Sequence, residues 1–487
     1  MSVPVSRLPL YLKPDPSRVI ARLFSPGDVK RTREIIGRIE AFPEGQVGEL
    51  LSGLKQNFRR QHADLLDIFA ENYAAICKMI GAPPAGSRDR QLLVGAYFTM
   101  DYALESVALF NPSIVPAILQ NDVPAGSVRF LMSLRAIGEG HISSIVFRLG
   151  LIDSAGDVQF EPPGEYTMSL KATVPDVFTK ASLAREMAAT GLTEENFKPI
   201  LDRLESRFTR EQLGEAIALV RQEQPSSGTV EEIADSLISL TRVNHQLHLP
   251  HKPPVFREVE IVIFPFSDLE RHGIEDLRLV RFEESDGSHV YYGTFTAYDG
   301  GRAYPQLFQY AGGDTIDVNL ITGECAKNKD MALFPRRINN RFAMISRIDN
   351  ENLFYMESDD VLNWDQAQVI QRPQFAWQVI QIGNCGSPIE TEKGWLLMTH
   401  GVGAMRQYCI GATLLDRDEP WRVIGQTREP LLVPTEEERA GYVPNVVYSC
   451  GAMVHNGMLI VPYAMSDLST SVARIELEAL LSELTMA

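Results

Sequence analysis

Glu275, Asp276 and Arg278 lie within four residues, just after Gly273 and at the start of an apolar strand-like run. A glycine permits the tight turn that would hold both carboxyl groups at the mouth of that strand. Two adjacent carboxyl groups beside a guanidinium suit general acid catalysis on a sugar better than they suit a protein core. A surface ion pair on a hairpin is the alternative, and the spacing alone does not decide between the two.

A basic cluster stands out between residues 327 and 347 of a chain that is otherwise acidic. If strand pairing gathers some of these side chains, their positive groups suit a phosphate or the hydroxyl groups of a sugar. Any single one of them could instead simply face solvent. The members are Lys327, Lys329, Arg336, Arg337, Arg341 and Arg347.

Two later segments also place polar side chains beside apolar strands. Glu390 precedes a strand that ends near His400, and Tyr463 and Asp467 fall at the end of the last such strand. His400 could bind substrate or be structural, and Asp467 could equally be a turn residue. Cys385 as a nucleophile with His400 as its base is a weaker alternative, because no elbow motif surrounds this cysteine.

The overall composition limits the class of protein. The 487 residues carry a formal net charge of -17, which disfavours nucleic acid as a partner. Five cysteines without a CxxC motif indicate reduced thiols rather than disulfides or zinc, and the scattered histidines indicate no metal site. Without an apolar leader or a run long enough for a membrane span, we expect a cytoplasmic protein that does not bind membranes.

The periodicity changes along the chain and divides it into four parts. Helical spacing predicts an N-terminal helical domain over 1–127, with helices expected within three segments. These segments are 28–42, 47–80 and 89–110. The first strands follow at 128–175, then a helical insertion at 176–243 whose helices begin near threonines, and then a β-rich remainder at 244–487.

The strand-rich parts favour one of two all-β architectures. Their strands recur roughly every 8–12 residues and are separated by Gly, Asn, Asp and Pro turns. Such a pattern is typical of a β-propeller of four or five blades, with a sandwich as the competing architecture. The helical segments carry apolar stripes, so we expect them to pack beside the mouth of the β domain and narrow it, or to form a homo-oligomer interface.

Several of these segments together resemble glycoside hydrolase family 130, the family of inverting β-mannoside phosphorylases and β-mannosidases. Any one of them would be weak evidence, but six occur in the family's order and at compatible spacings, and HISSIVFRLG at 141–150 resembles the family more weakly. The six are GIEDLR at 273–278, YYGTFTAYDG at 291–300, KDMALFPRRI at 329–338, GSPIETEKGWLLMTHGV at 386–402, GATLLD at 411–416 and VPNVVYSCGA at 443–452.

The resemblance implies a mainly β fold, a five-bladed β-propeller with an N-terminal α-helical domain and a helical insertion. It places the active site at one mouth of the central channel, with Asp276 as the general acid. The expected substrate-binding residues are Glu275, Arg278, Arg148, Asp299, His400, Tyr463 and Asp467. The expected phosphate-binding residues are Lys329, Arg336 and Arg347.

The implied activity is phosphorolysis of a terminal β-mannoside, with inorganic phosphate as co-substrate and no cofactor. Three features depart from the family pattern: Leu277 replaces the usual proline, Glu390 stands where a basic residue is common, and the first ~125 residues and the helical insertion have no place in compact members. The chain therefore looks like a divergent, longer branch of the family. An inverting β-mannosidase with Glu390 as its base is therefore the alternative enzyme. A non-catalytic carbohydrate-binding propeller is the alternative from another class.

Overall fold

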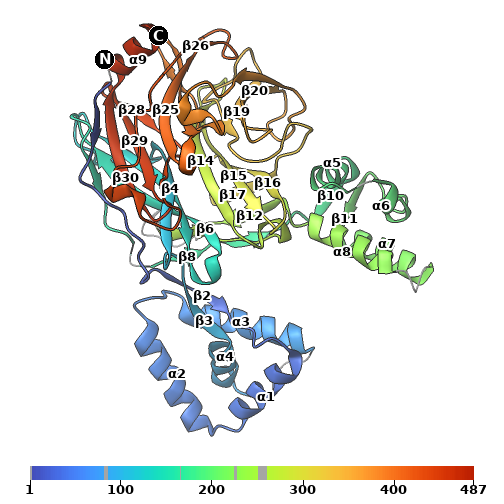
Figure 1. Ribbon diagram of the computed structural model, residues 1–487. Helices are drawn as coiled ribbons and strands as arrows, with labels where there is room; N and C mark the ends of the chain where they lie inside the picture. Colours follow the sequence, from blue (N-terminus) through green and yellow to red (C-terminus); the bar gives the residue numbers. More distant parts are fainter. Residues whose placement is uncertain are drawn as a thin grey trace.

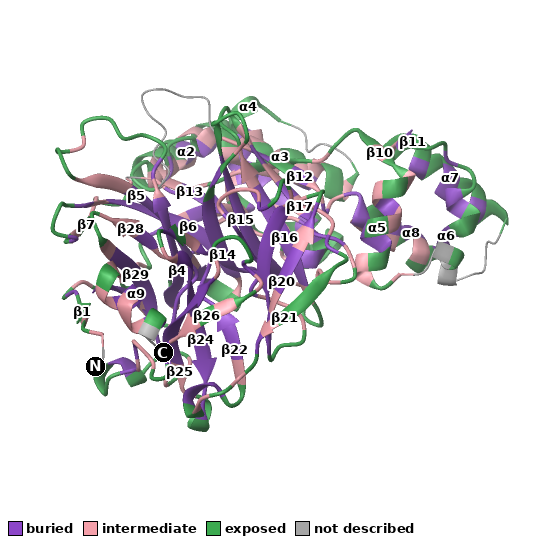
Figure 2. Cartoon of the chain, turned by 90° about the horizontal axis from the view of Figure 1, so that it is seen from above, coloured by how far each residue is buried: buried purple, intermediate pink, exposed green. Residues whose placement is uncertain are grey.

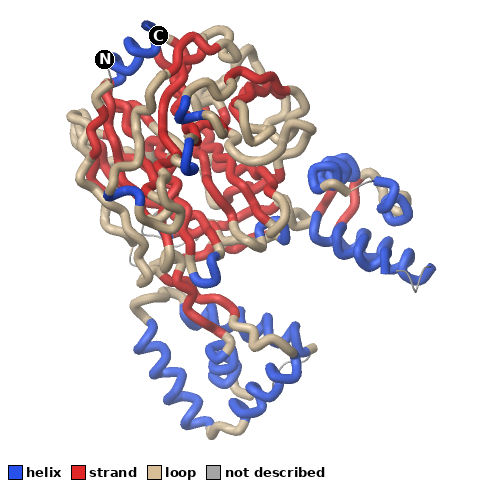
Figure 3. The backbone as a smooth tube through the Cα atoms, in the orientation of Figure 1, coloured by secondary structure: helices blue, strands red, loops and turns tan. Residues whose placement is uncertain are grey.

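The computed structural model describes residues 3–81, 86–164, 166–192, 194–223, 228–249 and 260–486. Figure 1 shows a body of β-sheets from which two separate groups of helices project, one below it and one to its right. Figure 3 shows the same division, with strands filling the body and helices concentrated in the two projections. Within the described residues, no helix combines the length and apolar character needed to cross a membrane.

The first group of helices forms a small unit with its own buried core. Asp28 caps its first helix by accepting a hydrogen bond from the Arg31 amide. Ile36, Val47 and Leu93 are among the residues that form this core. The four helices are α1 (Val29–Glu40), α2 (Glu44–Phe58), α3 (Leu65–Ile80) and α4 (Arg88–Tyr97).

Two of the predicted helical segments are shorter than expected. The segment 47–80 is interrupted between α2 and α3, where His62 turns inward and its Nε2 lies 2.7 Å from Oδ1 of Asp101. The helix in the segment 89–110 stops at Tyr97, because the β-branched and aromatic residues that follow form a strand of a two-stranded antiparallel sheet. Its strands are β2 (Val19–Leu23) and β3 (Thr99–Ala103), and Leu23 pairs with Thr99.

Most strands belong to five sheets of four or more strands within the described chain, each named here by one of its strands. The β4 sheet has the order β4 (Ala108–Pro116), β5 (Val128–Ile137), β6 (Ser143–Ile152), β13 (Ile261–Ile263) and β8 (Met168–Ser169), with β7 (Val158–Phe160) beside β6. The β14 sheet has the order β14 (Ile274–Glu283), β15 (His289–Tyr298), β16 (Ala303–Tyr310), β17 (Thr315–Leu320), β12 (His245–His248) and β9 (Lys171–Thr173).

The other three sheets come from the last part of the chain, except for one strand. The β18 sheet contains β18 (Ala332–Leu333), β19 (Phe342–Ser346), β20 (Leu353–Ser358) and β21 (Ala367–Gln371). The β24 sheet contains β22 (Gln381–Asn384), β24 (Gly394–Val402), β25 (Tyr408–Leu415) and β26 (Val423–Gln426), with β23 (Ile389–Thr391) beside β24. The β29 sheet contains β27 (Val447–Tyr448), β29 (Met458–Met465), β30 (Ser469–Glu476) and β1 (Val5–Arg7), with β28 (Met453–His455) beside β29.

Each sheet packs against two others through buried apolar side chains. Figure 2, which colours buried residues purple, shows that the strands of the β body are largely buried. Going from the β4 sheet through the β14, β18, β24 and β29 sheets and back, each neighbouring pair shares a buried cluster. One residue pair from each cluster, in this order, is Phe147 and Leu279, Phe282 and Met344, Ile345 and Trp395, Leu414 and Leu459, and Ile460 and Met132.

The range 1–127, predicted to be helical, also contains strands of the β body. β1 pairs with β30, so a strand from the start of the chain shares a sheet with one from its end. β4 pairs with β5 and is almost entirely buried, so the sheets begin before residue 128. The boundary expected at 127 is therefore too late, because Ala108–Pro116 is an apolar run that periodicity alone cannot assign to helix or strand.

The helical insertion is attached to the outer part of the β14 sheet. Its buried residues, among them Met187 and Leu237, share one cluster with Tyr304 and Leu320 of that sheet. It contains α5 (Lys180–Thr190), α6 (Glu194–Leu201), α7 (Arg210–Glu223), α8 (Gly228–Leu240) and a two-stranded antiparallel sheet of β10 (Val177–Thr179) and β11 (Arg207–Thr209). A last helix, α9 (Leu477–Met486), follows β30.

Candidate active site

An open cavity of about 350 Å³ lies where the ends of the five sheets meet, and polar side chains dominate its lining. Every sheet contributes, either from a strand or from a loop at a strand end. Its polar residues are Asn111, Arg135, Asp276, Lys329, Asp330, Arg347, Asn350, Gln381, His400, Arg406, Tyr408, Tyr448 and Asp467. We call it the central cavity.

Asp276 is directed into the central cavity by an irregular strand start. The pairing of β14 with β15 shifts register between Glu275 and Arg278, and Asp276 has a φ of 60°, which aspartate tolerates better than most residues. The Nδ2 group of Asn111 donates to Oδ1 of Asp276 at 2.5 Å, and Nη1 of Arg135 lies 3.7 Å from the same oxygen. The other carboxyl oxygen makes no hydrogen bond with a described residue and is available to a ligand.

Gly273 makes this turn possible. Its φ of 115° lies in the region that favours glycine, and a Cβ there would overlap Oγ and the backbone nitrogen of Ser143. The tight turn expected before the two carboxyl groups therefore rests on close contact with β6.

Glu275 forms a buried ion-pair group with two cations rather than facing the cavity. Its Oε1 accepts from Arg135 Nη2 at 2.8 Å, and its Oε2 pairs with Lys329 Nζ. Although burial acts in the other direction, Arg135 and Lys329 hold the pKa of Glu275 below its usual value. The two cations thus face two carboxyl groups, Glu275 and the neighbouring Asp276, which offset the charge that Lys329 could offer an anion.

Asp330 is the centre of a second buried network. Arg278 Nη2 and Arg347 Nε each donate to its carboxylate at 2.7 Å, and the hydroxyl of Tyr448 donates at 3.0 Å. Burial opposes ionisation, but the two guanidinium groups keep the pKa of Asp330 well below its usual range. Two arginines thus share one carboxylate, so this side of the cavity keeps a net positive charge.

His400 is fully buried at the wall of the cavity, beside this network. Burial and the nearby Arg347 and Arg278 lower its pKa to about 4, against the opposing effect of Asp330, so its ring is neutral at neutral pH. Its Nδ1 lies 3.2 Å from the carbonyl oxygen of Asn384, which requires the proton on Nδ1. Nε2 is then an acceptor, and it has no hydrogen-bond partner in the structure.

Asp467 and Arg406 occupy hairpin tips on the cavity wall. Burial, together with Asp276 and Glu275, raises the pKa of Asp467 to about 7, although Arg135 and Arg406 act in the opposite direction. Arg406 has a φ of 53° in the turn between β24 and β25, and it forms no ion pair with a described residue. Asp467 is therefore a carboxyl group that can change its charge near neutral pH.

The structure brings together seven of the residues proposed from the sequence. Asp276, Lys329, Arg347, His400 and Asp467 line the central cavity. Glu275 and Arg278 lie directly behind this lining, because each forms an ion pair with a lining residue. Arg278 was expected to hold the sugar, but its side chain is buried against Asp330 and Tyr448 and orients these residues instead.

Five of the proposed residues lie elsewhere. Arg148 makes two 2.7 Å hydrogen bonds to the buried Glu105, so it is part of the β4 sheet interior. Asp299 accepts hydrogen bonds from the amides of Gly301 and Arg302, both at 2.7 Å, and so stabilises the β15–β16 turn.

The other three residues are also held by partners within the protein, away from the central cavity. Tyr463 is buried and donates to Oε1 of Glu438 at 2.7 Å. Arg336 forms a bidentate pair with Glu390 at 2.7 and 2.9 Å and covers the Trp395 ring. Arg336 and Glu390 are both absent from the lining of the central cavity. Arg336 is therefore not positioned to bind phosphate there, and Glu390 is not positioned to act as the base for hydrolysis.

Four residues of the site were not predicted from the sequence: Asn111, Arg135, Asp330 and Tyr448. One signal was available: Asn111 precedes a proline within an apolar strand, where its φ of 48° produces a bulge. Asp330 lies inside the basic segment noted in the sequence, but only its contacts with Arg278 of β14, Arg347 after β19 and Tyr448 of β27 show its position.

Neither helical group narrows the central cavity. No residue of α1–α4 or α5–α8 appears among the described residues that line it. The expectation that these helices restrict the mouth is therefore wrong, because both groups pack at the outer edges of the β body (Figure 1).

Comparison with known proteins places the chain in a family. The sequence profile of glycoside hydrolase family 130, described as beta-1,4-mannooligosaccharide phosphorylase, matches residues 230–485, more than half of the chain. The chain belongs to glycoside hydrolase family 130. The matched range contains Asp276, Asp330 and His400, whereas Asn111 and Arg135 lie before it.

Relatives within family 130 include two bacterial phosphorylases. The chain is 33% identical over 220 residues to a 1,2-beta-oligomannan phosphorylase of Thermoanaerobacter sp., covering 44% of this chain and 71% of that protein. It is 26% identical over 259 residues to a beta-1,2-mannobiose phosphorylase of Listeria innocua, covering 51% and 68%. The solved structure of the Listeria enzyme with beta-1,2-mannobiose aligns with 79% of this chain and 94% of that one, at 20% identity and a TM-score of 0.45.

Proposed function

We propose that the chain is an inverting phosphorylase that cleaves a terminal β-mannoside with inorganic phosphate and yields α-mannose 1-phosphate. The observation that carries the proposal is the composition of the central cavity. It combines a carboxyl group with one unoccupied oxygen, Asp276, and a wall where two arginines share one carboxylate. Membership of family 130 and the named activities of its phosphorylases support the same reaction class.

For the fold we propose a five-bladed β-propeller with the site at one end of its axis. Five sheets that each pack against two neighbours, and a first strand that pairs with the last sheet, support this architecture. A propeller explains why residues far apart in sequence reach one cavity, since every blade directs one strand end to the axis. We propose that the α1–α4 group and the α5–α8 insertion are additions to this ring.

Asp276 would act as the general acid. In its protonated form it donates to the glycosidic oxygen, directly or through a sugar hydroxyl, while phosphate attacks the anomeric carbon from the opposite face. The bond to the leaving sugar breaks, the new carbon–oxygen bond to phosphate forms, and the leaving sugar takes the proton. Asn111 would hold the carboxyl group in place through its 2.5 Å hydrogen bond.

The wall around Asp330 would bind phosphate. Arg347 lines the cavity with a net positive charge behind it, because Arg278 shares the same carboxylate. His400 is fully buried, with Nε2 3.8 Å from Oδ2 of Asp330, so it would support this network rather than contact phosphate. Lys329 would contribute less, because it and Arg135 face two carboxyl groups, Glu275 and Asp276, whereas Arg347 and Arg278 share one. A nucleophilic phosphate of this kind needs positive charge and no base, and Glu390 lies outside the cavity.

The reverse reaction tests this proposal. Incubated with α-mannose 1-phosphate, the protein should release inorganic phosphate only when mannose or a manno-oligosaccharide is present as acceptor, and a β-mannoside should form. Release of phosphate without an acceptor, or no release with any acceptor, would contradict the proposed function.

A further inference from the structure

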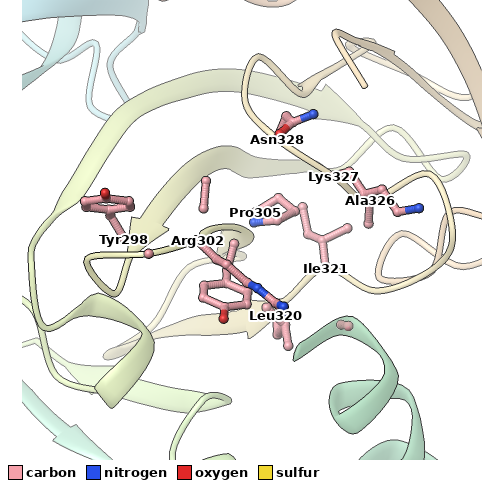
Figure 4. A pocket seen from close by; sticks show the side chains of 12 residues that line it. Tyr298, Arg302, Pro305, Leu320, Ile321, Ala326, Lys327 and Asn328 are labelled. Carbon is pink, nitrogen blue, oxygen red and sulfur yellow. The ribbon is translucent and has the colours of Figure 1, made fainter. Parts of the chain in front are cut away.

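A second cavity, of about 460 Å³, lies between the outer part of the β14 sheet and the end of α5 (Figure 4). The residues that matter for its chemistry are Ala189, Tyr298, Arg302, Leu320, Lys327 and Asn328. We call it the outer cavity. None of its lining residues entered the mechanism above.

The outer cavity opens on the same end of the β14 sheet as the general acid. β14 starts at Ile274, which pairs with Ala297, so the end of β15 lies beside Asp276. Residues 299–302 form the turn into β16, and β17 ends at Leu320, next to the same edge. With strands roughly 4.8 Å apart, the outer cavity lies about 10–15 Å from the start of β14.

The two cavities are separated by a single loop. Lys327 and Asn328 line the outer cavity, and the next residues, Lys329 and Asp330, line the central one. Consecutive Cα atoms are about 3.8 Å apart, so the wall between the cavities is thin. A chain that leaves the central cavity across this sheet therefore meets the outer cavity next.

The lining of the outer cavity suits a neutral, hydroxyl-rich ligand. Tyr298 presents a half-buried aromatic ring, and Lys327 is exposed without an ion pair to any described residue. Arg302 donates through Nη1 to the carbonyl oxygen of Thr190 at 2.9 Å, which leaves the rest of its exposed fork for a ligand. Within the described lining there is no carboxylate to neutralise these donors. An aromatic ring beside several donors matches the apolar face and the hydroxyl oxygens of a sugar ring.

The insertion completes this site. Ala189 closes one side, and α5 is fixed there by Arg302 and by the apolar cluster that Met187 shares with Leu320. The family profile begins at residue 230, so α5 lies outside the part of the chain that it matches.

We propose that the outer cavity is a distal saccharide subsite, which binds the part of a β-mannan chain that extends beyond the cleaved bond. The inference rests on the proposed function of the central cavity. It makes the insertion a device for selecting longer substrates: oligosaccharides that reach Tyr298 and Lys327 bind better than the disaccharide.

Substrate length gives the test. We would measure kcat/KM for phosphorolysis of β-1,2- and β-1,4-linked manno-oligosaccharides from the disaccharide to the pentasaccharide. Tyr298→Ala and Lys327→Ala should each lower kcat/KM roughly 3- to 10-fold for the pentasaccharide, the range of one exposed contact, and leave the disaccharide unchanged. Tyr298→Phe, which keeps the ring, and Lys198→Ala, an exposed lysine of the insertion outside the cavity, should change neither substrate.

The outcomes separate the two proposals. Equal losses for all lengths, or no loss for any length, would overturn the distal subsite while leaving the phosphorylase intact. Failure to cleave any mannoside would contradict the proposed function instead. Calorimetric binding of the pentasaccharide and the disaccharide then still decides the subsite, because equal affinities in the unaltered protein would overturn it.

Discussion

At the scale of single residues, phosphate binding would depend on how the basic side chains share carboxylates rather than on how many basic side chains are present. Lys329 and Arg347 both line the central cavity, yet Lys329 and Arg135 face two carboxyl groups, Glu275 and Asp276, whereas Arg347 and Arg278 share only Asp330. The same distinction removes Arg336, whose guanidinium is occupied by Glu390. Phosphate should therefore depend on Arg347 much more than on the other basic residues proposed from the sequence.

Three substitutions test this ranking. Arg347→Ala should raise the KM for phosphate about 10- to 100-fold, because a charge-assisted hydrogen bond contributes roughly 1.5–3 kcal/mol. Lys329→Ala should raise it less, and Arg336→Ala should leave it unchanged. Initial rates at varied phosphate give the comparison, with thermal melting to show that each variant folds. A larger effect for Arg336 than for Arg347 would refute the placement of phosphate.

Asp467 gives a prediction about pH. Because burial, Asp276 and Glu275 raise its folded-state pKa to about 7, the protonated form stabilises the fold below pH 4, and this stabilisation is lost as pH rises through 7. Asp467→Asn mimics the protonated form. Its free energy of unfolding should match that of the unaltered protein near pH 4 and exceed it by roughly 1–3 kcal/mol at pH 8.

Melting curves at both pH values check this, with Asp349→Asn as the control. Although partial burial acts against it, the amides of Asn352 and Glu351 lower the pKa of Asp349, so that variant should be least stable relative to the unaltered protein at the higher pH. An Asp467→Asn variant that loses stability at pH 8 would contradict the environment described for this residue.

At the scale of elements, the sequence predicted which segments carry chemistry but not which way their side chains face. The motif around Asp276 was recognisable because its residues are adjacent, whereas Asp330 reaches partners 17, 52 and 118 residues away. Arg336 and Arg347 looked equivalent in sequence, and only their places in the fold separate them. Arg336 lies in the loop between β18 and β19, beside Glu390, whereas Arg347 directly follows β19, beside Asp330. The strand β1 has only three residues, too few to show a periodicity, and its partner β30 lies at the other end of the chain.

Two truncations follow from the strand pairing. Phe24 donates from its amide to Phe98 at 2.8 Å, so residues 25–97 could be replaced by a two-residue turn without separating β2 from β3. The buried apolar clusters of α1–α4 consist mostly of residues from these four helices, so the β-sheets do not depend on them for packing. This variant should therefore fold and keep phosphorolysis. Deleting residues 3–12 should instead cost roughly 3 kcal/mol or more, because it removes β1 and the buried Leu8 from the β29 sheet.

Circular dichroism of both truncated proteins would show whether they fold, and thermal melting would compare their stability with that of the unaltered protein. Unfolding of the 25–97 replacement would show that α1–α4 support the sheets. An unchanged melting temperature after loss of residues 3–12 would show that β1 does not hold the first and last parts of the chain together.

At the scale of the whole molecule, an acidic chain would bind a doubly charged anion in one cavity. The net charge of -17 repels phosphate at long range, but salt screens that field beyond roughly 8 Å. Inside the cavity the nearest groups decide, and there Arg278 and Arg347 share a single carboxylate. The arrangement of the sheets, more than the composition of the chain, would thus create the phosphate site.

The dependence of cleavage on inorganic phosphate distinguishes a phosphorylase from a hydrolase. The protein would be incubated with β-1,2- and β-1,4-mannobiose, with and without inorganic phosphate, and the products separated, with Asp276→Asn as the inactive control. We predict that cleavage requires phosphate, that mannose 1-phosphate and mannose form in equal amounts, and that Asp276→Asn loses about 10²- to 10⁴-fold in rate while remaining folded. Release of free mannose alone at an undiminished rate without phosphate would contradict the account and make the protein a hydrolase.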